Sequence, residues 1–160
     1  MRHPDPSPAS TNPQPEPAPH TGDPAVPSGF APFHTVTGGF ISLIGPVHVR
    51  EVPGAPPVIG LRIAPQHLNL RGIPHGGLLA TLADTALGHA INHARGGPLS
   101  IVTVSLSTDF LAAARLGDWV EAHVEIERLG QRMAFASCRL RAGERVLLRA
   151  SGAFAVIGPA

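Results

Sequence analysis

Hydrophobic and polar residues alternate along most of the chain after residue 98, which is the pattern of strands with one buried face. Turn residues divide this region into four predicted strands, at residues 99–111, 119–128, 132–141 and 145–157. In the first strand, the side that we expect to cover a helix carries Val102, Val104, Leu106 and Phe110. In the second, one side carries Val120, Ala122, Val124 and Ile126.

An earlier pair of strands is predicted at residues 46–52 and 57–64, joined into a hairpin by the proline and glycine turn at 53–56. Residues 35–44 precede this pair and predict either a short helix or the start of a strand. Residues 65–74 have no clear period, so we expect a loop there.

A single long helix is predicted at residues 75–94, because apolar residues recur every three or four positions and alanine and leucine dominate. The helix is apolar over most of its circumference, so it should be buried. Its apolar positions are Leu78, Leu79, Leu82, Ala83, Ala86, Leu87, Ala90 and Ile91. The whole pattern predicts an α+β chain in which an antiparallel sheet encloses one helix.

Proline divides the chain of 160 residues into two parts, since ten of its 18 prolines lie in the first 32 residues. Residues 1–29 also have few large apolar side chains, so we expect a disordered leader. The remaining residues, 30–160, suffice for one compact domain with its own core.

Composition excludes several classes of protein. The net charge is +1 and the basic residues form no continuous stripe, so no nucleic acid partner is expected. The single cysteine, Cys138, rules out an internal disulfide and a cysteine-based zinc site. No apolar run reaches the roughly 18 residues of a membrane span, and the first residues lack the apolar core of a secretory signal. We therefore expect a cytoplasmic protein with no membrane partner.

The predicted helix begins with a candidate functional motif, His75-Gly76-Gly77. The first N–H groups of a helix lack internal partners and carry partial positive charge. Glycine allows close approach to these groups, so they could hold a developing oxyanion.

Asp84 lies in the middle of this helix among leucines and alanines, where a buried carboxylate is costly. Small neighbours one or two turns away leave room for a substrate, and one of them, Thr81, is a candidate substrate contact. The structural alternatives are that Thr81 satisfies the carboxylate or that Asp84 faces water.

Gly77 and Asp84 are seven residues apart, which is about 10 Å along a helix. One carbonyl cannot reach both in the same chain, so a second copy must supply one of them if both act on one substrate. This spacing predicts a homodimer with antiparallel helices and a shared site, and we expect dimers to associate further into a homotetramer.

The most specific motif is Asn69-x5-His75-Gly76-Gly77-x4-Leu82-Ala83-Asp84. It is accompanied by Arg115-Leu116-Gly117-Asp118, Leu129-Gly130-Gln131-Arg132 and Ala150-Ser151-Gly152-Ala153-Phe154. With these segments the chain, from about residue 33 to residue 157, resembles the hotdog-fold acyl-CoA thioesterases of the PaaI-like (phenylacetate-pathway) type.

The resemblance implies a five- or six-stranded sheet around one central helix, and hydrolysis of acyl- or aroyl-CoA thioesters to free acid and CoA without a cofactor. It implies that Asp84 is the catalytic carboxylate, either general base or nucleophile, and that the Gly77 N–H binds the thioester oxygen. Asn69 and His75 would orient water, carbonyl or sulfur. Thr103, on the strand after the helix, would assist.

Several of these residues have a structural alternative. His75 could be a cap, Asn69 could brace its loop, and Thr103 could be ordinary strand filler. Strand alternation also places Thr103 opposite the side expected to cover the helix, so a bulge or a dimer partner would have to bring it to the site. Three further candidate contacts for substrate are Gly76 and, for the phosphates of CoA, Arg71 and Arg132.

His89 and His93 are one helical turn apart, as two metal ligands would be. No third ligand is evident and the glutamate of an HExxH motif is absent, so we expect surface or helix-end histidines and no metal site. Two other functions would fit the same fold: a non-catalytic acyl-CoA-binding module and a hotdog enoyl-CoA hydratase.

Overall fold

The structure, a computed structural model, describes residues 26–33, 39–97 and 99–159. The predicted leader lies outside the described residues except for its last four, and so do residues 35–38 of the following segment. The elements are β1 (Ala31–Pro32), α1 (Phe40–Leu43), β2 (Val47–Val52), β3 (Ala55–Arg62), the 3-10 turn η1 (Pro65–His67), α2 (Gly76–Ala94), β4 (Leu99–Phe110), β5 (Trp119–Leu129), β6 (Met133–Ala142) and β7 (Arg145–Pro159).

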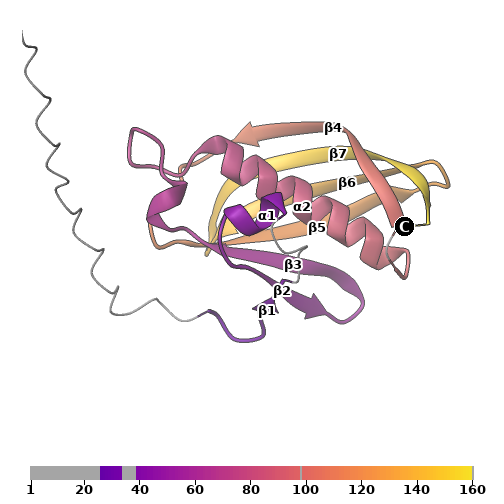
Figure 1. Cartoon of the computed structure of the whole chain (residues 1–160), viewed down its shortest axis with the longest axis horizontal. Helices are drawn as coiled ribbons and strands as arrows, with labels where there is room; N and C mark the ends of the chain where they lie inside the picture. The colour runs from indigo at the N-terminus through magenta and orange to yellow at the C-terminus, as the bar shows by residue number, and fades with distance from the viewer. Residues whose placement is uncertain (1–25, 34–38, 98, 160) are drawn as a thin grey trace, which may run out of the picture.

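All the strands form one antiparallel sheet in the order β1-β2-β3-β5-β6-β7-β4, and α2 lies along one side of it (Figure 1). The predicted α+β hotdog architecture is confirmed. The sheet has seven strands rather than five or six, and the smallest is the two-residue β1 at one edge. The consecutive strands β5, β6 and β7 lie side by side, β5 pairs with β3, and β4 pairs with β7 and forms the opposite edge.

Helix α2 is the centre of the core. The buried positions of the helix are the eight that the periodicity predicts, and Leu82, Leu87 and Ile91 are fully inaccessible to solvent. Burying one such side chain contributes about 1.5–3 kcal/mol. The described part of the segment predicted as helix or strand is helical, at α1, although this helix has only one turn.

The prediction for β4 is wrong at two positions. Val102 and Val104 are 47% and 60% exposed, whereas Thr103 points toward the helix and donates a hydrogen bond to it. The register with β7 shifts between Thr103 and Ser105, which marks a bulge. A bulge adds one residue and exchanges the two faces of a strand, so Leu106, three residues after Thr103, again packs against the core.

Cys138 lies in β6, is 2% exposed, and is part of the hydrophobic core. Burial raises the pKa of its thiol to about 12, so at pH 8 the thiol stays protonated and the reactive thiolate is scarce. We expect iodoacetamide to label Cys138 only after denaturation, as measured by mass spectrometry with and without guanidinium. Fast labelling of the folded protein would contradict the buried position.

Candidate functional site

The start of α2 is held by the side chain of His75. This residue has extended backbone angles, and its Nδ1 accepts a hydrogen bond of 2.9 Å from the Gly77 N–H. His75 is therefore the N-cap, the structural alternative given for it. The Gly77 N–H is therefore already engaged within the chain, by the side chain of His75. At Gly76 a Cβ would lie 3.2 Å from the Phe110 ring, which covers this glycine.

The loop before α2 is fixed by Asn69. Its Oδ1 accepts a hydrogen bond of 2.8 Å from the Arg71 N–H, and its backbone bonds to Ile73 and Gly72. Gly72 has φ +70°, in the left-handed region that favours glycine. Asn69 thus braces the loop in an Asx turn, and the side chain of Arg71 is exposed at its tip.

His67 is a second anchor of this loop, and no periodicity in the sequence indicates it. The side chain is 5% exposed; its Nδ1 accepts a hydrogen bond of 2.9 Å from the Ala64 N–H. Its Nε2 must therefore carry the proton and donate to the Ile44 carbonyl, 2.6 Å away. The His67 carbonyl accepts a bond of 2.8 Å from the His75 N–H, so His67 positions the residue that begins α2.

In the described part of the chain, the contact that best indicates a catalytic site is the one between Asp84 and Thr103. Thr103 Oγ1 donates a hydrogen bond of 2.9 Å to Asp84 Oδ1. The bulge in β4 makes this contact, because without it Thr103 would lie on the outer face of the sheet. The hydrogen bond to the Asp84 carboxylate comes from Thr103 and not from Thr81. The backbone carbonyl of Thr81 accepts a hydrogen bond of 2.8 Å from the Thr85 hydroxyl.

Asp84 and Thr103 open onto a cavity of about 310 Å³ between α2, β4 and β7. The other lining residues are Phe33, Thr85, Gly88, His89, Asn92, Ile101 and Phe154. The cavity is near the lower end of the range of about 300–1,000 Å³ for small-molecule sites. One face of α2 is therefore not closed by the sheet, and this face carries the carboxylate.

A larger cavity, of about 620 Å³, lies elsewhere, near Asp118 and Glu121. These carboxylates are already paired with arginines: Asp118 with Arg145 at 2.6 Å and Glu121 with Arg50 at 3.2 Å. The Asp84 cavity is consequently the better candidate site.

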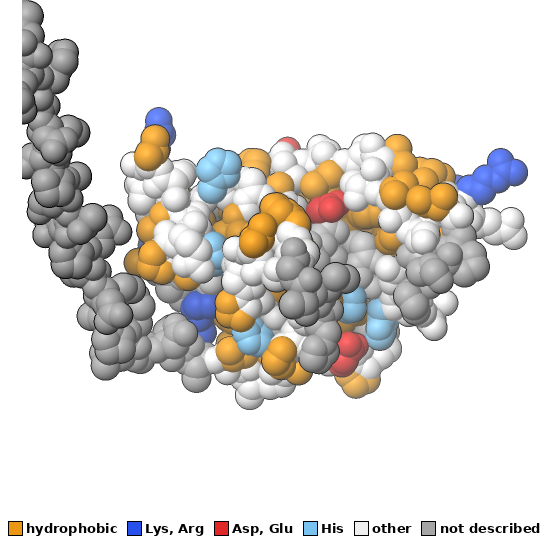
Figure 2. All heavy atoms as spheres, in the orientation of Figure 1, with side chains coloured by type: hydrophobic (Ala, Val, Ile, Leu, Met, Phe, Trp, Pro, Cys, Tyr) orange, Lys and Arg blue, Asp and Glu red, His pale blue; other side chains and the backbone are white. Residues whose placement is uncertain are grey.

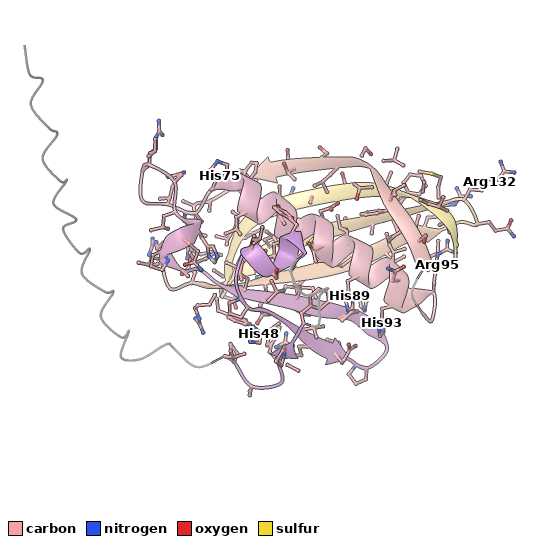
Figure 3. The ribbon with its side chains drawn as sticks, viewed as in Figure 1. His48, His75, His89, His93, Arg95 and Arg132 are labelled. Carbon is pink, nitrogen blue, oxygen red and sulfur yellow. The ribbon has the colours of Figure 1, made fainter. Side chains whose placement is uncertain are left out.

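The predicted site residues fall into two groups within one chain. Asn69, His75, Gly76 and Gly77 gather at the start of α2, while Asp84 and Thr103 lie two turns further along, a separation of about 10 Å. Arg132 lies at the other end of the molecule from His75 (Figure 3). The arginine proposed for one phosphate is thus remote from the helix start of the same chain.

His89 departs from the sequence prediction of a surface or helix-end histidine. It lines the Asp84 cavity, and its ring packs edge-on against Phe33 with centroids 4.9 Å apart. Burial lowers its pKa below the ordinary 6.5, an effect that Glu51 opposes and His93 reinforces. The described residues contain no group of three or more His, Cys, Asp or Glu placed to hold a metal ion.

No helix within the described residues is long and apolar enough to cross a membrane.

Comparisons with known proteins indicate the family of this chain. The family model "Thioesterase superfamily" matches residues 71–148, which include both Asp84 and Thr103. The chain is 47% identical over 129 residues to PA0474 of Pseudomonas aeruginosa, a protein provisionally named an esterase; the match covers 81% of this chain and 96% of that protein. It is 33% identical over 81 residues to acyl-coenzyme A thioesterase 13 of Mus musculus, covering 50% of this chain and 56% of that protein.

Among solved structures, the E. coli PaaI protein from the phenylacetic acid degradation operon superposes with a TM-score of 0.60 at 26% identity. The superposition covers 64% of this chain and 73% of that chain. The chain therefore belongs to the thioesterase superfamily, with the hotdog fold and the enzyme class of a thioester hydrolase.

Proposed function

We propose that this enzyme hydrolyses acyl-CoA thioesters to a free acid and CoA, with the reaction centred on Asp84. The observation that carries the proposal is the hydrogen bond from Thr103 to Asp84 at a cavity of suitable size. The hydroxyl donates to one carboxylate oxygen and thereby orients the other. The similarity to a mouse acyl-coenzyme A thioesterase supports CoA as the thiol.

In the general-base form of the reaction, Asp84 accepts a proton from a water molecule as the water oxygen attacks the thioester carbonyl. The tetrahedral intermediate then expels the CoA sulfur, and the proton passes from the carboxylic acid to that sulfur. In the nucleophile form, the carboxylate attacks the carbonyl itself, the C–S bond breaks and CoA leaves as the thiolate. Water then hydrolyses the resulting anhydride, which restores the carboxylate and releases the free acid, and the thiolate takes up the proton that the water gives up. Both forms consume one water and release one thiol, and neither uses a cofactor.

The oxyanion in this reaction is stabilised by the helix start of a second copy. Asp84 and Gly77 of one chain are too far apart for one carbonyl, so we place the Gly77 N–H of the partner at the oxygen. The substrate oxygen then replaces His75 Nδ1 as the acceptor of that N–H. The freed imidazole of His75 lies beside the reacting carbonyl, and it can orient this carbonyl.

The exposed edge of the sheet supports association with a second copy. β4 is a 12-residue edge strand next to the Asp84 cavity, and exposed edges of this length are normally covered. Figure 2 shows few charged side chains on the face that carries α2. On the outer face of the sheet, the exposed Val102, Val104 and Phe135 could join two dimers into a tetramer.

An antiparallel dimer would also bring together parts that are remote in one chain. The helix start, with Arg71 on the loop before it, would approach the far end of the partner, where Arg132 lies (Figure 3). Guanidinium groups pair well with phosphates, so we place these arginines at the phosphates of CoA. We expect the enzyme to work in the cytoplasm, where CoA esters are made and consumed.

The proposal is tested by thiol release from a panel of acyl- and aroyl-CoA esters, measured with a thiol-reactive dye. We expect one free thiol for each ester consumed. Tight binding without thiol release would instead indicate a binding module, and hydration of an enoyl-CoA without thiol release would indicate a hydratase.

Thr103 should affect the rate less than Asp84 does, because it acts through the carboxylate. We expect Thr103→Val, which keeps the shape and removes the hydroxyl, to lower kcat about tenfold, the equivalent of one hydrogen bond to a charged group. Thr103→Ser should retain most of the activity. Equal kcat for the valine variant and the wild type would show that the hydroxyl is only strand filler.

A further inference from the structure

Gly88 lies inside α2, where glycine is among the least favourable residues for a helix. Glycine is needed where the backbone has a positive φ or where another group approaches closely. Gly152 on β7 is a case of close approach, because a Cβ there would lie 2.7 Å from the ring of Phe154. Gly88 has no positive φ, and the closest atoms on the facing strands, Ile101 Cδ1 and Phe154 Cε1, would lie 3.7 and 3.8 Å from a Cβ. Packing against these strands therefore does not require a glycine at position 88.

Gly88 forms part of the floor of the Asp84 cavity, and it is itself partly open to solvent. Asp84, Gly88 and Asn92 are spaced by four residues, so they follow one another on the same face of α2, and all three line the cavity. Gly88 lies about 6 Å from Asp84 along the helix axis. The floor of the cavity thus carries no side chain at the turn that follows the carboxylate.

The walls of the cavity beside Gly88 are apolar. Ile101 and Phe154, the two side chains that a Cβ at Gly88 would contact, both line the cavity, and so does Phe33. A methyl group at position 88 would therefore occupy space between the helix and these walls. A hydrocarbon group placed there would be transferred from water to apolar surroundings, which is favourable.

We propose that Gly88 is a specificity-determining residue, because its missing side chain leaves room in the cavity for the body of the acyl group. The enzyme then accepts thioesters whose acyl group is apolar and several carbons long, with the carbonyl at Asp84 and the following carbons over Gly88. The inference rests on the proposed function, because that function places the reacting carbonyl at Asp84.

The test compares hexanoyl-CoA with acetyl-CoA on the full-length protein, because an acetyl group is too short to extend from Asp84 to Gly88. The wild type should have a kcat/KM for hexanoyl-CoA at least equal to that for acetyl-CoA. Gly88→Ala should lower the ratio of the two kcat/KM values, hexanoyl over acetyl, about tenfold, as expected for one methyl group in an apolar pocket. The thermal unfolding midpoint should not fall, since alanine is more favourable than glycine in a helix.

A second variant combines Gly88→Ala with Ile101→Val, which removes the Cδ1 atom that the new Cβ would contact. This double variant should recover part of the wild-type ratio, because space is returned to the cavity. Gly97→Ala is the matched control: Gly97 lies outside the Asp84 cavity, and no described atom beyond its chain neighbours lies within 4 Å of a Cβ there. It should leave the ratio at the wild-type value.

An unchanged ratio in Gly88→Ala, or a wild type that prefers acetyl-CoA, overturns the proposal. A double variant that recovers none of the ratio also overturns it. If Gly88→Ala unfolds, or elutes differently from the wild type in size-exclusion chromatography, then packing or assembly requires the glycine, and the proposal is overturned as well.

A failure of the proposed function would be visible separately, as the absence of thiol release from either ester by the wild type. Affinity is then measured for the corresponding 2-oxoalkyl thioethers of CoA, which cannot be hydrolysed. If Gly88→Ala weakens binding of the longer thioether about tenfold relative to the shorter one, the assignment of Gly88 is supported. Equal weakening, no change, or no binding of either compound overturns it.

Discussion

Asp84→Asn is expected to lower kcat for acyl-CoA hydrolysis by about two to four orders of magnitude, the usual contribution of a general base. Asparagine keeps the size of the side chain and can still accept the hydrogen bond from Thr103. It cannot take a proton from water or act as a nucleophile. The fold should be unaffected, so the KM and the thermal unfolding midpoint should change far less than kcat.

Asp109→Asn is the control for this prediction. Asp109 is on β4, the same strand as Thr103, but it is exposed and outside the cavity. Its kcat should equal that of the wild type. If Asp84→Asn hydrolysed the substrates at the wild-type rate, the catalytic base would have to be sought elsewhere in the chain.

His67→Leu is expected to have the largest effect on stability among the loop residues. Leucine fills the volume of the imidazole but leaves the Ala64 N–H and the Ile44 carbonyl without their partner. A buried polar group without a partner costs about 1–3 kcal/mol, so we expect a loss of about 2–4 kcal/mol in the free energy of unfolding. Urea titration followed by circular dichroism measures this loss.

The disturbance caused by His67→Leu should also extend to the start of α2, because the His67 carbonyl accepts a hydrogen bond from the His75 N–H. His93→Leu removes an imidazole of the same size from an exposed position, and it should change the free energy of unfolding by less than about 0.5 kcal/mol. If the two variants lost similar amounts of unfolding free energy, the hydrogen bonds of His67 would contribute no particular stability.

The central helix was predictable because a single physical effect determines it. A helix enclosed by a sheet must place its apolar residues on the enclosed side, and the period of 3.6 makes these visible in the sequence. All eight predicted positions, from Leu78 to Ile91, are buried. The strands β5, β6 and β7 also followed from alternation. The two-residue β1 was not predicted, and β3 has five consecutive buried residues in place of an alternation.

The bulge in β4 was not predictable from alternation, since a single extra residue leaves no mark in the pattern of Val102, Thr103 and Val104. Its consequence is large, because it turns Thr103 toward Asp84. The resemblance to a known family indicated Thr103 when the pattern did not. The structure places the Thr103 hydroxyl beside Asp84, whereas the strand pattern had placed it on the opposite face.

The two histidines that the sequence did not reveal, His67 and His89, are defined by tertiary contacts. His67 joins α1, the end of β3 and the loop before α2. His89 is partly covered by Phe33, a residue 56 positions earlier in the chain. No local pattern could have reported either contact, because the partners come together only in the fold.

The proposed sharing of each active site between two chains is tested most directly by mixing subunits. We mix two single variants, one carrying Asp84→Asn and the other carrying Gly77→Val. In Gly77→Val, the Cβ would lie 3.0 Å from His75 Nδ1, and the side chain blocks approach to the helix start. Each variant alone should be nearly inactive. In a mixed dimer, however, the intact Asp84 of one chain meets the intact Gly77 of the other.

Two different affinity tags allow the mixed dimer to be purified free of both parents. Its kcat per dimer in the thiol-release assay should be about half that of the wild type, because one of two sites is intact. A mixed dimer no more active than its parents would contradict a site built from two chains.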